Sequence, residues 1–406
     1  MRVPDGVRTA VNVLLCLAAV VATGWSGREI WLVWDGRRQI DAACGGFVPA
    51  GRVLALSEAG GTITHRRLDD DSFDPATGIP RDCEIFSTEA GERHGSSTGS
   101  RWFFTGEMGV LPTDRPRVVD NPVEDLVDPR GGRTHPSQPL GGGIAGTVTD
   151  NDVTVQLPCE GGTAKGRPVE ALWARAALLS RVASEERAHD RDVLAETAVI
   201  MANNLADRLG CADRLPDAPD HAPDLSEGPV PAARAEGTCA WYGKSGLAER
   251  SPYPDTVVES RTDDGVWDER CGLVLGDGRA RSLYLSEADR HDWLSEPQLA
   301  GQWSVSLHTY SGPVAENLHL TRTYGDEAPE PAAPGKAGRS AGEPIWWASS
   351  VCDGRPQIHT MAVATGYDRL VAPRMEQVFR AYVDDVTARR HCTDTVLPES
   401  SAFRAH

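Results

Sequence analysis

Eight widely spaced cysteines, the nine of the chain without Cys16 of the apolar N-terminal run, are the feature that most constrains the fold of this 406-residue chain. They are Cys44, Cys83, Cys159, Cys211, Cys239, Cys271, Cys352 and Cys392. An even set of cysteines beyond a membrane signal predicts disulfides in an oxidising compartment. Zinc is the competing interpretation, but structural zinc sites use closely spaced cysteine pairs, and these cysteines contain no such pair. The pattern therefore favours a disulfide-tied chain over a metal-binding one.

The order of the cysteines indicates an internal repeat. Successive cysteines lie 39, 76 and 52 positions apart in the first four, and 32, 81 and 40 positions apart in the last four. Gly-Arg-Pro follows the third cysteine of each set, at 166–168 and 354–356. Leu-Pro follows the fourth cysteine of each set, at 215–216 and 397–398. Matches that recur in the same order predict two tandem copies of one domain.

The predicted copies are residues 40–213 and 237–398, and each is long enough to bury a core. Residues 214–236 join them and are rich in Pro, Ala and Asp. Such a composition is typical of an extended, semi-rigid spacer.

The N-terminus carries an uncharged, largely apolar run at 9–27, after a short predicted cytoplasmic tail at 1–8. Crossing a hydrocarbon core of about 30 Å takes roughly 20 residues at about 1.5 Å each, so the run is long enough. The aromatic stretch at 30–34 is typical of a membrane–water interface. We expect an uncleaved transmembrane signal-anchor. The alternatives are a signal peptide cleaved near 22–24 and a buried helix.

The cysteines set the expected orientation, because disulfides form outside the cytoplasm. We expect a single-pass protein of the cell membrane with the bulk of the chain extracytoplasmic. The formal net charge of −18 argues against nucleic acid as a partner, since phosphate binding needs clustered Lys and Arg.

Hydrophobic periodicity predicts an α+β fold: an N-terminal transmembrane helix, then two copies of an antiparallel sheet with one long C-terminal helix packed on it. The expected strands are 62–65, 83–88, 102–105, 147–157, 169–177, 271–275, 281–286, 303–310, 318–324, 345–351 and 357–364. The expected helices are 184–210 and 372–391. Ser184 is a candidate N-terminal cap for the first.

The disulfide pairing stays open at this stage, because four cysteines allow three connectivities. If the last two cysteines of each copy tie helix to sheet, the pairs are Cys159–Cys211 and Cys352–Cys392. The remaining pairs would then be Cys44–Cys83 and Cys239–Cys271. Each such loop contributes roughly 3–4 kcal/mol in the chain-entropy model.

Three strings match motifs of catalytic or binding sites. Residues 95–99 fit G-x-S-x-G, but charged neighbours replace the strand and helix that a nucleophile elbow needs. Residues 141–146 fit G-x-G-x-x-G, but a strand is expected after them instead of a helix. The acidic run at 69–74 lacks the order of ligands of a calcium loop. We therefore predict no catalytic residue, no metal site and no cofactor from these motifs.

Histidines and tryptophans are the remaining candidates. His308 and His359 lie on expected strands, where a sheet-face role is the simpler interpretation, although a Ser/His/Asp triad can assemble from distant residues. Candidate binding tryptophans are Trp102, Trp241, Trp346 and Trp347. Burial in a disulfide-stabilised core is the simpler account of these side chains.

The layout of one short N-terminal span, cysteine-paired repeats and a bias for arginine over lysine resembles uncharacterised membrane-anchored, disulfide-containing proteins of Streptomyces-type actinobacteria. This resemblance implies the architecture and no activity. We expect a non-enzymatic protein whose tandem domains bind an envelope protein or a small ligand. The alternative is an extracytoplasmic hydrolase with a spatially assembled site, for which converging Ser, His and Asp in one copy would argue.

Overall fold

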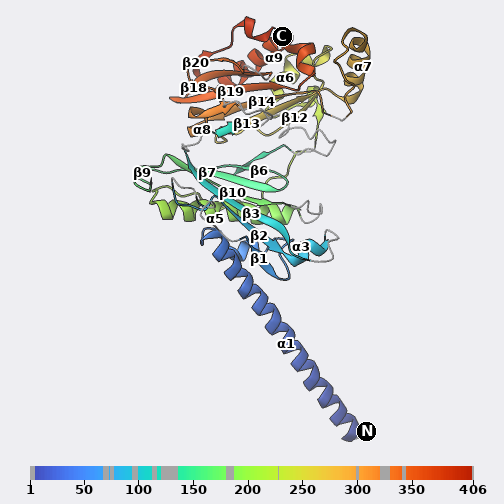
Figure 1. Ribbon diagram of the computed structural model, residues 1–406, viewed down its shortest axis with the longest axis vertical. Coiled ribbons are helices and arrows are strands. Elements are labelled where there is room, and N and C mark those ends of the chain that lie inside the picture. Colours follow the sequence, from blue (N-terminus) through green and yellow to red (C-terminus); the bar gives the residue numbers. More distant parts are fainter. Residues whose placement is uncertain are drawn as a thin grey trace.

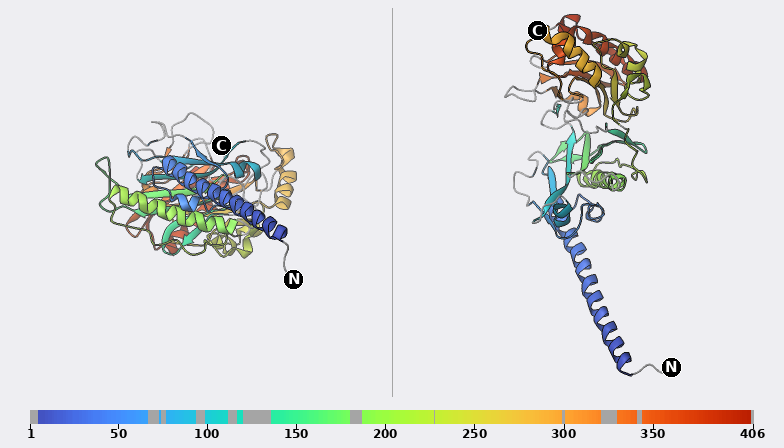
Figure 2. Two further views of the ribbon diagram at one scale, coloured as in Figure 1. Left: turned by 90° about the horizontal axis from the view of Figure 1, so that it is seen from below. Right: turned by 90° about the vertical axis from the view of Figure 1, so that its right-hand side faces the viewer.

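The computed structural model describes residues 5–66, 73, 77–93, 99–111, 117–119, 136–179, 187–226, 228–298, 301–320, 330–340 and 344–404. Its longest element is helix α1, Asp5–Cys44, which projects away from the body as a single rod (Figures 1 and 2). The segment from Val11 onward is apolar and long enough to cross a membrane. Its side chains are exposed up to residue 31, so α1 is not a buried core helix.

The first repeat contains a seven-stranded sheet in the order β1-β2-β3-β10-β7-β6-β5. Its strands are β1 Ile63–His65, β2 Asp82–Ser87, β3 Arg101–Leu111, β5 Gln138–Gly141, β6 Ile144–Val148, β7 Asp152–Pro158 and β10 Ala171–Leu178, with a small hairpin of β8 Thr163–Ala164 and β9 Arg167–Pro168. Its helices are α2 Ala50–Val53, α3 Thr88–Arg93 and the long α5 Arg187–Leu209, which packs across β7 and β10.

The second repeat contains an eight-stranded sheet in the order β11-β12-β13-β14-β19-β18-β17, with β20 also paired to β18. Its strands are β11 Val230–Pro231, β12 Thr256–Glu259, β13 Asp268–Val274, β14 Ser304–Ser311, β17 Gly338–Arg339, β18 Ile345–Cys352, β19 Arg355–Val363 and β20 Thr393–Val396. Its α-helices are α6 Ala240–Lys244, α7 Asp277–Glu287, α8 Pro313–Glu316 and the long α9 Tyr367–Arg389. Short 3-10 turns are η2 Ala232–Arg234, η3 Leu247–Glu249, η4 Ala288–Arg290 and η5 Ser400–Phe403.

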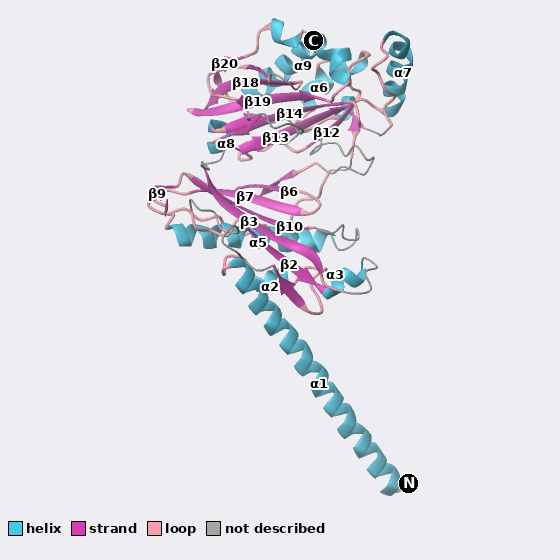
Figure 3. Ribbon diagram, in the orientation of Figure 1, coloured by secondary structure: helices cyan, strands magenta, loops and turns pink. Residues whose placement is uncertain are grey.

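The two sheets share one topology. In the first sheet β10 lies between β3 and β7, and in the second sheet β19 lies between β14 and β18. In both sheets the long helix follows this central strand in the chain. Every pairing within these two sheets is antiparallel. The predicted α+β fold of two tandem copies, each with a C-terminal helix on an antiparallel sheet, is therefore confirmed (Figure 3).

Each copy contains two disulfides, and none of the four joins one copy to the other. The pairing is the one expected if the last two cysteines of each copy tie its long helix to its sheet. The disulfides are Cys44–Cys83, Cys159–Cys211, Cys239–Cys271 and Cys352–Cys392. The first of them fastens the end of α1 to strand β2. The apolar helix is thus part of the first repeat rather than a separate tether.

The two repeats contact each other along an interface that we call the seam. Its apolar part joins Leu111 and Ala171 of the first repeat to Trp267, Tyr310 and Trp347 of the second. Backbone pairing also crosses it, because β4 (Arg117–Val119) runs parallel to β15 (Leu318–Leu320), which pairs in turn with β16 (Glu330–Pro331). Helix α9 lies on the opposite side of the second sheet, away from the first repeat (Figure 3).

Polar contacts in the seam centre on Gln138, which is 1% exposed. Its side-chain amide donates to the Glu259 carbonyl (3.3 Å) and to Ser226 Oγ (3.1 Å), and its oxygen accepts from the backbone N–H of Arg261 (3.0 Å). Arg261 also donates to the carbonyl of Pro139 (3.3 Å). The seam is therefore hydrogen-bonded as well as apolar.

The connection between the repeats is extended, as its composition predicts, but it also packs on α5. We call residues 213–226 the linker strap. Asn203 of α5 holds both the N–H and the carbonyl of Leu215 (2.9 and 3.1 Å). Asp192 of α5 accepts from the N–H of Ala222 (2.6 Å) and pairs with His221 (3.2 Å). Leu215 and Ala222 are both buried against the first core.

Two expected strands differ from the structure. Residues 281–286 alternate like a strand but belong to helix α7, because Ala280 and Leu283 bury one helical face and Asp277 occupies the first turn. The expected strand 147–157 is instead a hairpin of β6 and β7. Thr149 bonds to the backbone and carboxylate of Asp152 there and makes a turn.

The long helices match their predicted cores, with one shifted start. Helix α9 begins at Tyr367 rather than near 372, although Pro373 is typical of a first turn. Tyr367 is fully buried, stacks on Trp303 and donates to the carbonyl of Pro252 (2.6 Å), which fixes the extra turn. The predicted cap Ser184 lies outside the described residues.

Candidate functional site

The four candidate tryptophans do not gather at one surface. Trp346 is fully buried and stacks on Phe403, and Trp241 is packed in the same core. Trp347 lies in the seam cluster. Trp102 is 36% exposed on the first sheet. Core burial, the simpler interpretation, applies to Trp241 and Trp346, so these side chains cannot line a common groove.

A row of polar side chains lies on the seam side of the second sheet. His308 Nδ1 is 2.8 Å from Asp268 Oδ1, and His308 Nε2 is 3.0 Å from Ser306 Oγ. Arg270 donates to the other carboxylate oxygen of Asp268 (2.8 Å). Burial alone would raise the pKa of Asp268, but Arg270 and His308 outweigh it and hold that pKa well below its usual range.

The order Ser306–His308–Asp268 is that of a catalytic triad, which is recognised by geometry rather than by sequence order. Ser306 and His308 are each 1% exposed and Asp268 is 6% exposed. A nucleophile must touch its substrate, and the Ser306 hydroxyl is closed off from solvent here. The arrangement therefore works as a satisfied hydrogen-bond chain in the seam.

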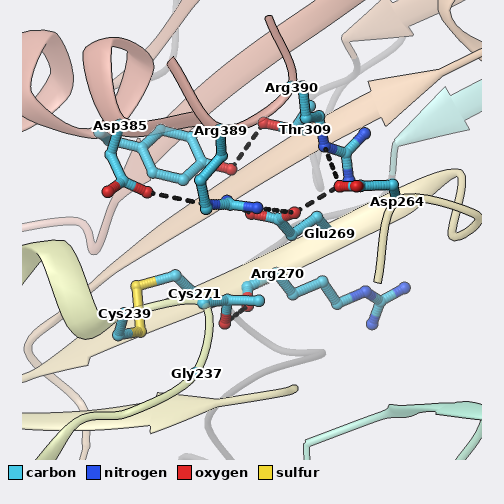
Figure 4. Close-up of polar contacts among 12 residues, drawn as sticks. Gly237, Cys239, Asp264, Glu269, Arg270, Cys271, Thr309, Asp385, Arg389 and Arg390 are labelled. Carbon is cyan, nitrogen blue, oxygen red and sulfur yellow. Dashed lines mark hydrogen bonds and ion pairs between the residues drawn. A yellow bond between two sulfur atoms is a disulfide. The ribbon is translucent and has the colours of Figure 1, made fainter. Parts of the chain in front are cut away.

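The helix side of the same sheet carries a second polar cluster around Glu269, shown in Figure 4. The Glu269 carboxylate accepts from Arg389 (2.5 Å) and Arg390 (2.9 Å), both at the end of α9. Asp385 pairs with Arg389 one turn earlier (3.1 Å). Desolvation opposes the charge on Arg389, but the hydrogen bonds and charges of Glu269 and Asp385 raise its pKa above the ordinary value. This cluster fastens α9 to β13 by charge-assisted bonds.

Beside it runs a neutral chain centred on His359, which is fully buried. His359 Nδ1 is 2.8 Å from Thr309 Oγ1, and His359 Nε2 is 2.9 Å from Ser350 Oγ. Thr309 also bonds to the Tyr382 hydroxyl of α9 (2.8 Å). Burial, with a smaller contribution from the Arg390 charge, lowers the pKa of His359 to about 3. The imidazole is therefore neutral, and the chain through it links strands β14, β18 and β19 to helix α9.

The first repeat has no histidine at the position equivalent to His308. The pairing of β2 with β3 and of β13 with β14 makes Glu107 the counterpart of His308. Glu107 binds Arg175 across the first sheet (3.2 Å), and Arg175 also reaches Asp152 (3.4 Å). The first copy thus has an ordinary, half-exposed ion-pair group at the position where the second has its histidine.

A surface depression of 580 Å³ lies on the outer face of α9. We call it the α9 groove; it is lined by Tyr253, Pro373, Arg374, Glu376, Gln377, Arg380, Ala381 and Asp384. Its volume falls within the range of about 300–1,000 Å³ that is usual for ligand sites. Glu376 and Arg380 pair with each other (2.9 Å), whereas Arg374 and Asp384 form no ion pair within the part of the chain that the structure describes. Helix α9, which carries most of the lining residues, is at the end of the molecule opposite α1 (Figure 1).

Of the three sequence motifs, only the one at 141–146 lies fully within the described residues, and it forms no site. Gly141, Gly142 and Gly143 all have positive φ and form the tight turn between β5 and β6, so this G-x-G-x-x-G string is a hairpin. Residues 95–98 of G-x-S-x-G, and 69–72 and 74 of the acidic run, lie outside the described residues. Within the described ranges, no group of three or more His, Cys, Asp or Glu side chains is placed to hold a metal ion.

These features define a disulfide-bonded tandem α+β protein with one apolar N-terminal helix. No protein-family model, curated protein or solved structure matches the chain. Sequence reasoning missed both the Glu269 cluster and the α9 groove. The only available signal was the charged run Asp268-Glu269-Arg270 directly before Cys271. Alternate residues of a strand face opposite sides, so such a run places charged side chains on both faces of the sheet.

Proposed function

We propose that this chain is a membrane-anchored, extracytoplasmic protein that binds a partner of the cell envelope through its second repeat, without catalysing a reaction. The observation that carries the proposal is helix α1. Its apolar half is exposed along 11–31, and its other end is covalently fastened to β2 through Cys44–Cys83. An exposed apolar helix of this length is stable only within a membrane or when covered.

The arrangement of the body supports a presenting role. The first repeat and α1 lie on one side of the second sheet, and helix α9, whose residues line the α9 groove, lies on the other (Figure 1). With α1 in the membrane, the first repeat stands next to the bilayer and the second repeat is displayed away from it. Such an architecture suits a binding domain held at a distance from the membrane.

Topology and binding are tested together in cells. A protease added to intact cells should remove a C-terminal epitope, and an N-terminal tag should remain on the membrane-bound species. A protected C-terminus would contradict the orientation, and loss of the N-terminal tag would establish a cleaved signal peptide. A photo-crosslinking residue at Gln377 or Leu285 should give one adduct that Arg208 in the first repeat does not give. If no position gives an adduct, the binding role is wrong.

The second candidate is an extracytoplasmic hydrolase, favoured by the 3.0 Å and 2.8 Å bonds of Ser306, His308 and Asp268. A fluorophosphonate probe tests it, because such a probe labels an activated serine. We expect no labelling at Ser306, since its hydroxyl is buried. Labelling that disappears in Ser306→Ala would favour the hydrolase instead.

A further inference from the structure

The two long helices can be compared position by position, because both precede the last cysteine of their repeat. Aligning Cys211 with Cys392 superimposes the fully buried residues of the two helices. These are Leu194, Ala198, Met201 and Leu205 in α5, and Met375, Phe379, Tyr382 and Val386 in α9. The outer faces of the two helices therefore correspond as well.

On α5 this outer face is occupied by the linker strap. The strap is held at Asn203 and Asp192, whose side chains bind the backbone of Leu215 and Ala222. These positions are eleven residues apart, which is three turns along one face of the helix. The strap thus runs along α5 as an extended, proline-rich segment.

On α9 the matching positions are Asp384 and Pro373, and both line the α9 groove. The chain after Cys392 is the counterpart of the strap, but it lies along α9 for only a short distance. Pro398 accepts from Arg380 (3.3 Å) and Ser400 bonds to Glu376 (2.7 Å), both on one edge of the groove. The chain then turns away, and Phe403 packs into the core on Trp346. No described segment covers the rest of the groove.

We propose that the α9 groove binds an extended, proline-rich, acidic segment of a partner protein, in the way that α5 binds the linker strap. This proposal deepens the proposed binding function and rests on it. Extended proline-rich segments are already close to their bound conformation, so docking them costs little conformational entropy. Tyr253 supplies an aromatic wall, as in other grooves that recognise such segments.

Charge specifies the ligand further. Asp384 replaces Asn203 and can accept a backbone N–H at one end of the groove. Arg374 lies ten residues earlier, about 15 Å along the helix, and is free to pair with a carboxylate. About five extended residues at roughly 3.1 Å each span that distance. The strap sequence meets this requirement, because Asp220 lies five residues after Leu215.

The strap sequence 215–224 (LPDAPDHAPD) is therefore the probe. A fluorescein-labelled peptide of this sequence, titrated against the full chain in detergent micelles, should bind with a Kd below about 1 mM by fluorescence polarisation. Arg374→Glu and Ala381→Trp should each weaken binding by roughly tenfold or more, through repulsion and through filling of the groove. Arg355→Glu is the matched control, since it makes the same charge change at an exposed hairpin of the same repeat, and should leave binding unchanged.

Peptide variants separate charge from shape. Replacement of Asp220 by Asn should weaken binding, whereas replacement of Asp217 by Asn should not. No saturable binding of the parent peptide, or equal binding by the Arg374→Glu, Ala381→Trp and Arg355→Glu chains, would overturn the proposal. Self-association of the full chain that Ala381→Trp abolishes would make a second copy the occupant and would also overturn it. A crosslinked adduct from Leu285 together with failed peptide binding would leave the proposed function standing without this site.

Discussion

Asp268 and Glu269 are neighbours in the sequence and occupy opposite faces of the second sheet. Asp268 contributes to the seam through His308, and Glu269 binds the end of α9 through two arginines. Because strand side chains alternate, Asp268 ties β13 to β14 on the seam side, whereas Glu269 fastens β13 to α9 on the other side. The burial of both carboxylates is compensated by these partners.

The first prediction concerns the Glu269 carboxylate. Glu269→Gln keeps the side-chain shape but removes the nearer carboxylate from Arg390, whose side chain is only 4% exposed and then has only the exposed Asp264 at 3.8 Å among the described residues. Breaking a buried ion pair by removing one partner costs about 3–5 kcal/mol. We expect a loss of this size in guanidinium denaturation of the full chain in micelles, with faster hydrogen exchange in α9. Glu287→Gln, whose partner Arg290 is 70% exposed, is the control and should cost less than about 1 kcal/mol.

The second prediction concerns pH. The pKa of His359 is about 3 in the folded chain and about 6.5 when unfolded, so the unfolded state binds a proton more readily between these values. Stability should therefore fall as pH decreases from about 6.5 to about 3, by up to about 1.4 kcal/mol per pH unit from this residue. His359→Gln should reduce the slope of unfolding free energy between about pH 4 and pH 6 by close to one proton. The lowered pKa values of Asp268 and Glu376 act in the same direction and remain in the variant, so identical slopes would contradict the assignment to His359.

At the scale of elements, the linker strap owes its extended conformation to its composition and its position to packing on α5. Its Pro, Ala and Asp content predicts an extended segment without helix or strand, and residues 213–226 have that form. Its position on α5 depends on Asn203 and Asp192, which look like ordinary exposed helix residues in the sequence. The backbone of the strap pairs with no strand of the described chain, so hydrogen bonds from these two side chains hold it on α5.

The third prediction tests that attachment. Asn203→Ala removes two hydrogen bonds to Leu215, each worth about 0.5–1.5 kcal/mol. Local opening of the strap should increase roughly five- to 100-fold, seen as faster limited proteolysis within 213–226 and no change in global unfolding. Arg208→Ala, at an exposed position on the same helix, should leave the cleavage rate unchanged. Equal rates in both variants would mean that the strap is held in another way.

At the scale of the whole molecule, the seam makes the two repeats a joined body instead of independent domains on a spacer. Helix α1 enters the first repeat without interruption and ends at Cys44, so the apolar helix and this body are mechanically continuous. The position of the second repeat then depends on the contacts around Gln138 and on the apolar cluster beside it.

The fourth prediction addresses this coupling. Gln138→Ala removes hydrogen bonds to Glu259, Ser226 and Arg261 from a site that is 1% exposed. The seam should weaken by about 1–3 kcal/mol. Hydrogen exchange should rise at β5 and β12, while α5 and α9 keep their protection. Gln298→Ala, in an exposed loop of the second repeat, should change neither. Unaltered exchange at β5 and β12 in Gln138→Ala would show that the apolar cluster alone holds the seam.

The candidate surfaces were less predictable than the fold. The tryptophans are conspicuous in the sequence, but Trp241 and Trp346 are core residues, because large aromatic side chains contribute most when they are buried. The α9 groove consists of charged positions on the outer face of a helix, and such residues carry no periodic signal that separates a groove from a solvated surface.

The sequence by itself determined the apolar N-terminal helix, the two cysteine-defined copies, the strand-then-helix order of each, and the extended linker. These properties follow from local chemistry: apolar length, periodicity and turn residues act over a few neighbouring positions. Only the tertiary structure decided the disulfide pairing, the seam, the attachment of the strap to α5 and the exposure of the matching face of α9. Those depend on which residues meet in space, and the free energy of such contacts comes from burial and hydrogen bonding between segments that the sequence separates by 12 positions, as for Asn203 and Leu215, to 123 positions, as for Gln138 and Arg261.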